Sequence, residues 1–182
     1  VREQKVQRLY VDRLLADYNG ERQLKLAWDS GNGAAGKVMS ELCSRLPGQH
    51  ILLNVEIDGN FPSHLPDPTL PAALEQLRQV VLEEKCDFGI AFDGDGDRIG
   101  VVDNEGQILW GDQLLTIFAS EILKQNPGAK IIADVKASQV LFEEVTRLGG
   151  EPILCRTGHS FIKEKMLKTK ALLAGEMSGH IF

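Results

Sequence analysis

Short apolar runs alternate with helical patterns along most of the sequence, and this alternation limits the possible folds more than any other feature. Helical spacing covers 6–17, 70–84, 112–124, 138–148 and 160–167, together with a segment that follows Gly36 and runs towards Leu46. The apolar runs predict strands at 24–28, 51–56, 87–92, 99–103, 107–110, 130–134, 151–155 and 171–174. Strands separated by helical segments of about 10–15 residues are typical of βαβ units. The sequence therefore predicts an α/β fold with two consecutive βαβ-type domains and mixed, mainly parallel sheets.

A hairpin signal marks the boundary between the two predicted domains. Asn104-Glu105-Gly106 forms a turn between two short apolar runs, and the alternating pattern starts again after Gly111. We therefore expect one domain over residues 1–107 and a second over 108–182. The last four residues, 179–182, read as the beginning of another apolar strand, so the second domain is expected to be incomplete and the chain to be a fragment.

Composition excludes several classes of function. The chain has 182 residues and a net charge of −6, which argues against a nucleic-acid binder with a broad cationic surface. No apolar run reaches the roughly 18 residues of a membrane span, and the first residues lack the apolar segment of a signal peptide. The three cysteines, at 43, 86 and 155, form no CxxC pair. We expect a reduced, cytoplasmic setting, with neither nucleic acid nor membrane as partner.

The most specific motif is the acidic loop Asp93-Gly94-Asp95-Gly96-Asp97-Arg98. Three carboxylates this close repel one another, and a hard divalent cation relieves that repulsion. An EF-hand does not fit, because Arg98 stands where its invariant glycine belongs and Asn104 where its bidentate glutamate belongs. With only three protein carboxylates, the site favours Mg²⁺ with open positions for water or phosphate. Arg98 adds a planar, permanently charged donor suited to a phosphate oxygen. The competing interpretation is a solvated acidic turn.

A second loop, Gly31–Gly36, allows two interpretations. It follows a predicted strand and opens a helix, and Glu56 stands at the end of the next predicted strand. This arrangement satisfies the dinucleotide-binding fingerprint of an NAD-dependent oxidoreductase. It is equally typical of a tight strand-to-helix turn built from small residues, or of a helix N-terminus that holds any anion.

Three further loops follow the carboxyl ends of predicted strands, where ligands bind in open α/β sheets. They are Asp134–Lys136, Thr157–Ser160 and Gly175–His180. In the last loop Glu176, Ser178 and His180 alternate, so an extended backbone would present all three on one side, as groups suited to sugar hydroxyls. Taken singly, Lys136 is typical of a surface charge and His159 of a residue beside a helix cap.

These motifs together resemble the α-D-phosphohexomutase family, over essentially the whole chain. The likeness lies in SGNGAAG, GNFPSHLPDP, FDGDGDR, TGHS and GEMSGH, taken in this order. It implies the second domain and part of the third domain of an enzyme that moves a phosphate between O1 and O6 of a hexose. Such an enzyme works through a phosphoserine and a hexose 1,6-bisphosphate, and the form GEMSGH is more like the phosphomannomutase/phosphoglucomutase branch than the glucosamine branch.

The resemblance also implies roles for individual residues. Asp93, Asp95 and Asp97 would hold Mg²⁺, and Arg98 would sit beside the transferring phosphoryl group. Glu176 and Ser178 would bind O3 and O4 of the sugar, with His180 nearby. Lys136 and His159 would line the same cleft, His159 as a candidate for proton transfer.

The departures from the family matter as well. The phosphoserine motif of the first domain and the phosphate-binding loop of the fourth are missing, so we expect the chain alone to be inactive. The resemblance also favours the packing interpretation of Gly31–Gly36 over the nicotinamide one. Two alternatives remain to be tested: an NAD-dependent oxidoreductase that uses Gly31–Gly36, and a non-catalytic module that binds sugar phosphate or metal.

Overall fold

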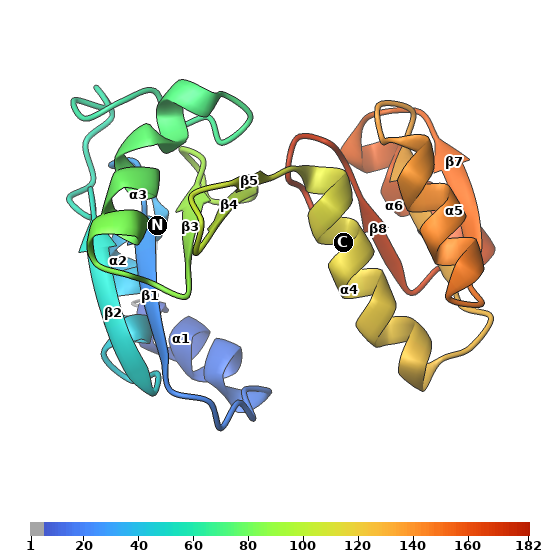
Figure 1. Cartoon of the computed structure of the whole chain (residues 1–182), viewed down its shortest axis with the longest axis horizontal. Helices are drawn as coiled ribbons and strands as arrows, with labels where there is room; N and C mark the ends of the chain where they lie inside the picture. Colours follow the sequence, from blue (N-terminus) through green and yellow to red (C-terminus); the bar gives the residue numbers. More distant parts are fainter. Residues whose placement is uncertain (1–5) are drawn as a thin grey trace, which may run out of the picture. The chain divides into compact units, whose positions relative to one another are not determined.

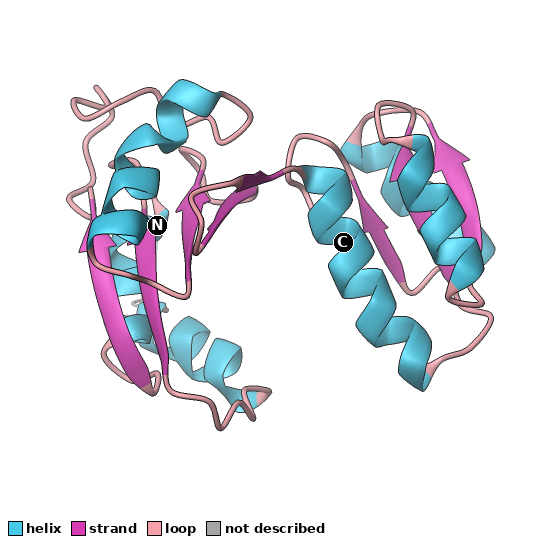
Figure 2. Ribbon diagram, in the orientation of Figure 1, coloured by secondary structure: helices cyan, strands magenta, loops and turns pink. Residues whose placement is uncertain are grey.

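The computed structural model describes residues 6–182, and it confirms the predicted α/β fold class. Helices and strands alternate along most of the chain, as Figure 1 and Figure 2 show, but over residues 88–109 three strands follow one another without a helix. The chain divides into two compact units. One runs to Asp97 and includes Val102–Gln107, and the other comprises Arg98–Val101 and Ile108–Phe182.

The larger sheet has five strands in the order β2-β1-β3-β4-β5. Their bounds are β1 Leu24–Asp29, β2 Gly48–Leu53, β3 Phe88–Phe92, β4 Ile99–Asp103 and β5 Ile108–Leu109. Strand β1 is parallel to both β2 and β3, so Ala27 lies between Ile51 and Gly89. The carboxyl ends of β1 and β3 therefore meet at one edge of the sheet, where Asp29 pairs with Ala91.

The helices of the first unit are α1 Gln7–Ala16, α2 Ala35–Cys43 and α3 Pro71–Glu83. Met39 and Cys43 of α2 pack with Leu26 and Trp28 of β1 in one buried cluster. Helix α3 packs against β1 and β3 through its own buried residues, among them Leu77. Burial of these apolar side chains supplies the main stabilisation of the unit.

The second unit has a three-stranded parallel sheet in the order β7-β6-β8. Its elements are α4 Gly111–Gln125, β6 Lys130–Asp134, α5 Gln139–Arg147, β7 Glu151–Cys155, α6 His159–Thr169 and β8 Leu173–Gly175. Ile131 and Ala133 of β6 pack against α4 and α5, whereas Ile132 packs against Ile162 of α6. Because successive strand residues point to opposite faces, β6 is buried on both sides.

Most elements lie where the sequence predicts them, but β2 does not. We expected this strand at 51–56, and it runs from Gly48 to Leu53. Asn54 ends it, because its backbone turns into the left-handed region (φ 53°) and its side-chain amide donates to Asp29 at 2.9 Å. The strand pattern in the sequence continues to residue 56, but the chain after Leu53 forms a loop. The predicted strand therefore extends beyond the end of β2.

Within residues 6–182, no helix combines the length and apolar character that crossing a bilayer requires.

The start of α2 depends on a close backbone approach at Gly36. A Cβ atom at this position would lie 2.0 Å from the carbonyl oxygen of Val55. We expect Gly36→Ala to lower the free energy of unfolding by about 1–3 kcal/mol or more, as overpacking does. Gly59→Ala is the control, because open space surrounds a Cβ there, and it should change stability by less than about 0.5 kcal/mol. Urea denaturation followed by circular dichroism measures both, and equal midpoints would contradict the prediction.

Candidate functional site

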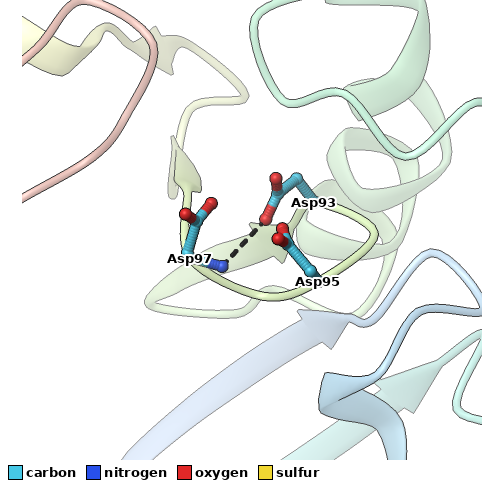
Figure 3. A group of neighbouring side chains, drawn as sticks. All are labelled: Asp93, Asp95 and Asp97. Atoms are coloured by element: carbon cyan, nitrogen blue, oxygen red, sulfur yellow. Dashed lines mark hydrogen bonds between the residues drawn. The ribbon is translucent and has the colours of Figure 1, made fainter. Parts of the chain in front are cut away.

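The acidic loop after β3 brings its three carboxylates together. One carboxylate oxygen from each of Asp93, Asp95 and Asp97 lies within 4.8 Å of the other two. Figure 3 shows the three side chains gathered around this loop. Asp93 is 1% exposed, whereas the other two are exposed. Its Oδ1 accepts hydrogen bonds from the backbone N–H groups of Gly96 and Asp97, each at 3.0 Å. The buried carboxylate thus folds the loop, and the exposed pair stands at the surface beside it.

Electrostatics in this loop favour a cation. The pKa of Asp95 is raised, first by a hydrogen bond with Asp93 and then by the negative charges of Asp93 and Asp97. A divalent cation would reverse this effect, because it stabilises all three groups in their ionised form. Three clustered carboxylate oxygens are ligands that Mg²⁺ prefers, and exposure on one side leaves room for water or a phosphate. The residues therefore fit the predicted metal.

The Gly31–Gly36 turn does not present a free phosphate cradle. The N–H groups of Asn32, Gly33 and Ala34 donate to the carbonyl oxygens of Asn54, Ser30 and Gly94. The N–H of Gly31 donates to Asp29 Oδ1 at 2.9 Å. These are the donors that a pyrophosphate would need, and the protein's own acceptors occupy them. The turn is a packing element, and the nicotinamide interpretation has no support here.

In the second unit the residues of the last loop form a polar cluster. His180 Nδ1 lies 2.6 Å from Glu176 Oε2 and 3.0 Å from Ser178 Oγ. Glu176 is 4% exposed, and its other oxygen accepts from the N–H of Gly158 at 2.6 Å. The predicted group of Glu176, Ser178 and His180 is thus in mutual contact, and its acid is held by the loop that follows β7.

Asp134, at the end of β6, connects the same loops. It is fully buried, and its Oδ2 accepts from the hydroxyl of Thr157 at 2.9 Å. Its Oδ1 lies 3.4 Å from the N–H of Met177. We assigned this residue no role from sequence. The available signal is an acid at the end of an apolar strand, which is weaker than the closely spaced carboxylates that identify Asp93.

The three predicted catalytic residues lie at the ends of elements. Lys136 is exposed in the turn after β6, and His159 is exposed as the first residue of α6. Both follow carboxyl ends of the parallel sheet that carries Glu176. Arg98 is half-buried between Asp97 and β4.

Comparison with known proteins identifies the family. Residues 8–106 match the model of phosphoglucomutase/phosphomannomutase alpha/beta/alpha domain II, and residues 110–182 match that of domain III. The chain belongs to the phosphoglucomutase/phosphomannomutase family.

Individual relatives agree with this assignment. The chain is 50% identical to a phosphomannomutase/phosphoglucomutase of Pseudomonas putida, over 95% of this chain and 37% of that protein. It is 43% identical to a phosphoglucomutase of Neisseria gonorrhoeae, over 100% of this chain and 40% of that protein. A crystal structure of a family protein from Burkholderia thailandensis superposes with a TM-score of 0.93 at 47% identity, over 97% of this chain and 39% of that one. The chain thus spans less than half the length of these relatives.

The raised pKa of Asp95 has a consequence for stability. A carboxyl whose pKa is higher in the folded chain contributes stability below its unfolded pKa, and this is lost as pH rises through the folded pKa. Without metal, the ionised cluster therefore destabilises the chain at pH 7. We expect Asp95→Asn to melt at a higher temperature than the parent at pH 7 in a chelator, and the difference to shrink near pH 3.

Glu56→Gln removes an exposed carboxylate elsewhere in the first unit and should leave the melting temperature nearly unchanged. A melting temperature of Asp95→Asn at or below that of the parent at pH 7 would show that the carboxylates do not repel one another.

Proposed function

We propose that the protein to which this chain belongs is a phosphomannomutase/phosphoglucomutase. It would interconvert hexose 1-phosphate and hexose 6-phosphate, for mannose, glucose or both, through a phosphoserine and a hexose 1,6-bisphosphate. The observation that carries the proposal is the clustered triad of Asp93, Asp95 and Asp97 in a chain that also carries a built polar loop around Glu176. The names of the relatives support the same activity.

The acidic loop would hold Mg²⁺ through Asp93, Asp95 and Asp97. When bound, the ion would supply positive charge to a phosphoryl group, whose transfer depends on positioning and charge neutralisation. The contribution of the chain itself is a loop that is already folded, because Asp93 accepts the N–H groups of Gly96 and Asp97. Because the loop is already ordered, bringing the three carboxylates together around the ion costs less conformational entropy.

The polar cluster would bind the sugar. Glu176 and Ser178 would contact O3 and O4, with His180 beside them. Support comes from the fixed orientation of the Glu176 carboxylate between the Gly158 N–H and the His180 ring. An acceptor in a fixed position distinguishes sugars by where their hydroxyl groups lie. A sugar without a hydroxyl group at the matching position leaves the buried acceptor without a hydrogen bond, which is costly.

Three further residues would assist phosphoryl transfer, either by stabilising the charge of the phosphoryl group or by moving a proton to or from the sugar hydroxyl group. Arg98 would stabilise the transferring phosphoryl group with its planar guanidinium. His159 would transfer a proton to or from the reacting hydroxyl, and Lys136 would contribute positive charge. Exposure of Lys136 and His159 at the carboxyl end of a parallel sheet supports their access to a ligand.

The organisation of the whole protein follows from these assignments. We assign residues 1–107 and 108–182 to the second and third domains, and the ranges 8–106 and 110–182 of the family models support this division. The partners are hexose phosphates and the first and fourth domains of the same enzyme, which carry the phosphoserine and a further phosphate-binding loop. The three free cysteines support a cytoplasmic location. No observation favours the oxidoreductase or the non-catalytic module.

Turnover tests the proposal directly. We expect the 182-residue chain to leave glucose 1-phosphate and mannose 1-phosphate unchanged, and the whole protein to convert at least one of them in the presence of Mg²⁺. Glu176→Gln in the whole protein should lower kcat/KM by about a hundredfold, because it removes a charged acceptor from the site. Coupled spectrophotometric assays measure these rates.

Glu164→Gln is the matched control, since Glu164 is an exposed residue of α6 paired with Lys168, and its activity should equal that of the parent. Full activity of Glu176→Gln, or turnover by the isolated chain, would contradict the proposal.

A further inference from the structure

A buried pair of Asp29 and His64, close to the acidic loop, has no part in the chemistry proposed above. Asp29, the last residue of β1, is fully buried. Its Oδ2 lies 2.9 Å from Nε2 of His64, whose side chain is 15% exposed. His64 belongs to the proline-rich loop, residues 58–70, which precedes α3. Its Oδ1 accepts from the N–H of Gly31 and the amide of Asn54, each at 2.9 Å.

The ring of His64 is held at both of its nitrogen atoms. Nδ1 of His64 lies 3.1 Å from the carbonyl oxygen of Leu65, so both ring nitrogens face acceptors. A deeply buried carboxyl group is tolerated when it is hydrogen-bonded, and Asp29 has partners in Gly31, Asn54 and His64.

The loop that His64 fixes lies directly on two other segments. A Cβ on Gly31 would be 2.8 Å from Cβ of Pro66, so the proline-rich loop packs directly on the first residue of the Gly31–Gly36 turn. A Cβ on Gly94 would be 3.3 Å from the Phe61 ring and 3.6 Å from Cγ of Pro66. The same loop therefore covers the turn and one residue of the acidic loop.

The turn in its own right holds the acidic loop by the backbone. Ala34 N–H donates to the carbonyl oxygen of Gly94 at 2.9 Å. A Cβ on Gly33 would lie 2.7 Å from that same oxygen, which shows how closely the two backbones approach. Gly94 is the residue between Asp93 and Asp95, so its position sets the spacing of two of the three clustered carboxylates.

We propose that Asp29 and His64 are positioning residues for the metal site: the pair fixes the proline-rich loop and the Gly31–Gly36 turn, and these fix Gly94. This inference rests on the proposed binding of a divalent cation by Asp93, Asp95 and Asp97. Groups that orient metal ligands from outside the first coordination sphere commonly change affinity by about 10–100-fold when they are removed. The pair acts through a backbone carbonyl, so we expect the lower end of that range.

The test is a calorimetric titration of the 182-residue chain with Mn²⁺ as a stand-in for Mg²⁺. His64→Ala should weaken Mn²⁺ binding about tenfold. His64→Gln keeps a donor near the position of Nε2 and should restore affinity to within about twofold of the parent. Asp29→Asn removes the negative charge with little change in volume and should weaken binding as His64→Ala does. It carries the test if His64→Ala does not fold.

Val81→Ala is the control for general destabilisation. Val81 is a fully buried residue of α3 that touches Gly89, near the start of β3 and away from the end that carries Asp93. It should lower the melting temperature and leave Mn²⁺ affinity within about twofold of the parent. Asp95→Asn removes one of the proposed metal ligands, so its Mn²⁺ affinity is the reference for a chain whose site is lost.

Two failures are distinguishable. If the parent chain binds Mn²⁺ and the His64→Ala and Asp29→Asn variants bind it equally well, the positioning role is wrong and the metal site stands. If the parent chain does not bind Mn²⁺, or binds it as Asp95→Asn does, the metal site is wrong and this inference falls with it. A loss of affinity in Val81→Ala as large as in His64→Ala would also overturn the inference, because destabilisation alone would explain it.

Discussion

Buried carboxylates at the carboxyl ends of parallel strands organise both units. Asp29 and Asp134 are the last residues of β1 and β6, whereas Asp93 and Glu176 directly follow β3 and β8. All four are at most 4% exposed. Each accepts a hydrogen bond from a backbone N–H or a side chain, either of its own loop or of a neighbouring one. A buried carboxylate is tolerated only when such donors surround it. The loops therefore have one favourable arrangement, and the functional groups that they carry are held in place before any ligand arrives.

Much of this could be predicted, because the signals are local. Strands β4, β6 and β7 have the predicted bounds, since each is a short apolar run with clear breaks at both ends. The acidic loop could be predicted because Asp93, Asp95 and Asp97 are neighbours in sequence, and short spacing alone brings their oxygens together. The cluster around Glu176 follows for the same reason.

The rest depends on contacts between distant segments, which no local pattern records. The end of β2 at Asn54 is set by Asp29, 25 residues earlier. The Gly31–Gly36 turn matches a phosphate cradle in sequence, and only the fold shows that Asn54 and Gly94 occupy its donors. Asp134 could have been found from its position after an apolar strand, but its partner Thr157 could not. In each case the deciding contact joins two segments that are far apart in the sequence.

Amide hydrogen exchange tests most directly whether buried carboxylates hold the loops. The N–H groups of Gly31, Gly96 and Gly158 donate to Asp29, Asp93 and Glu176. Those of Asn60 and Glu105 lie in exposed turns and donate to Asp58 and Asp103, which are less buried. We predict that the first three amides of the metal-free chain exchange at least about tenfold more slowly than the other two, because local opening must break a buried, charge-assisted hydrogen bond. Equal exchange rates in the two groups would contradict the account.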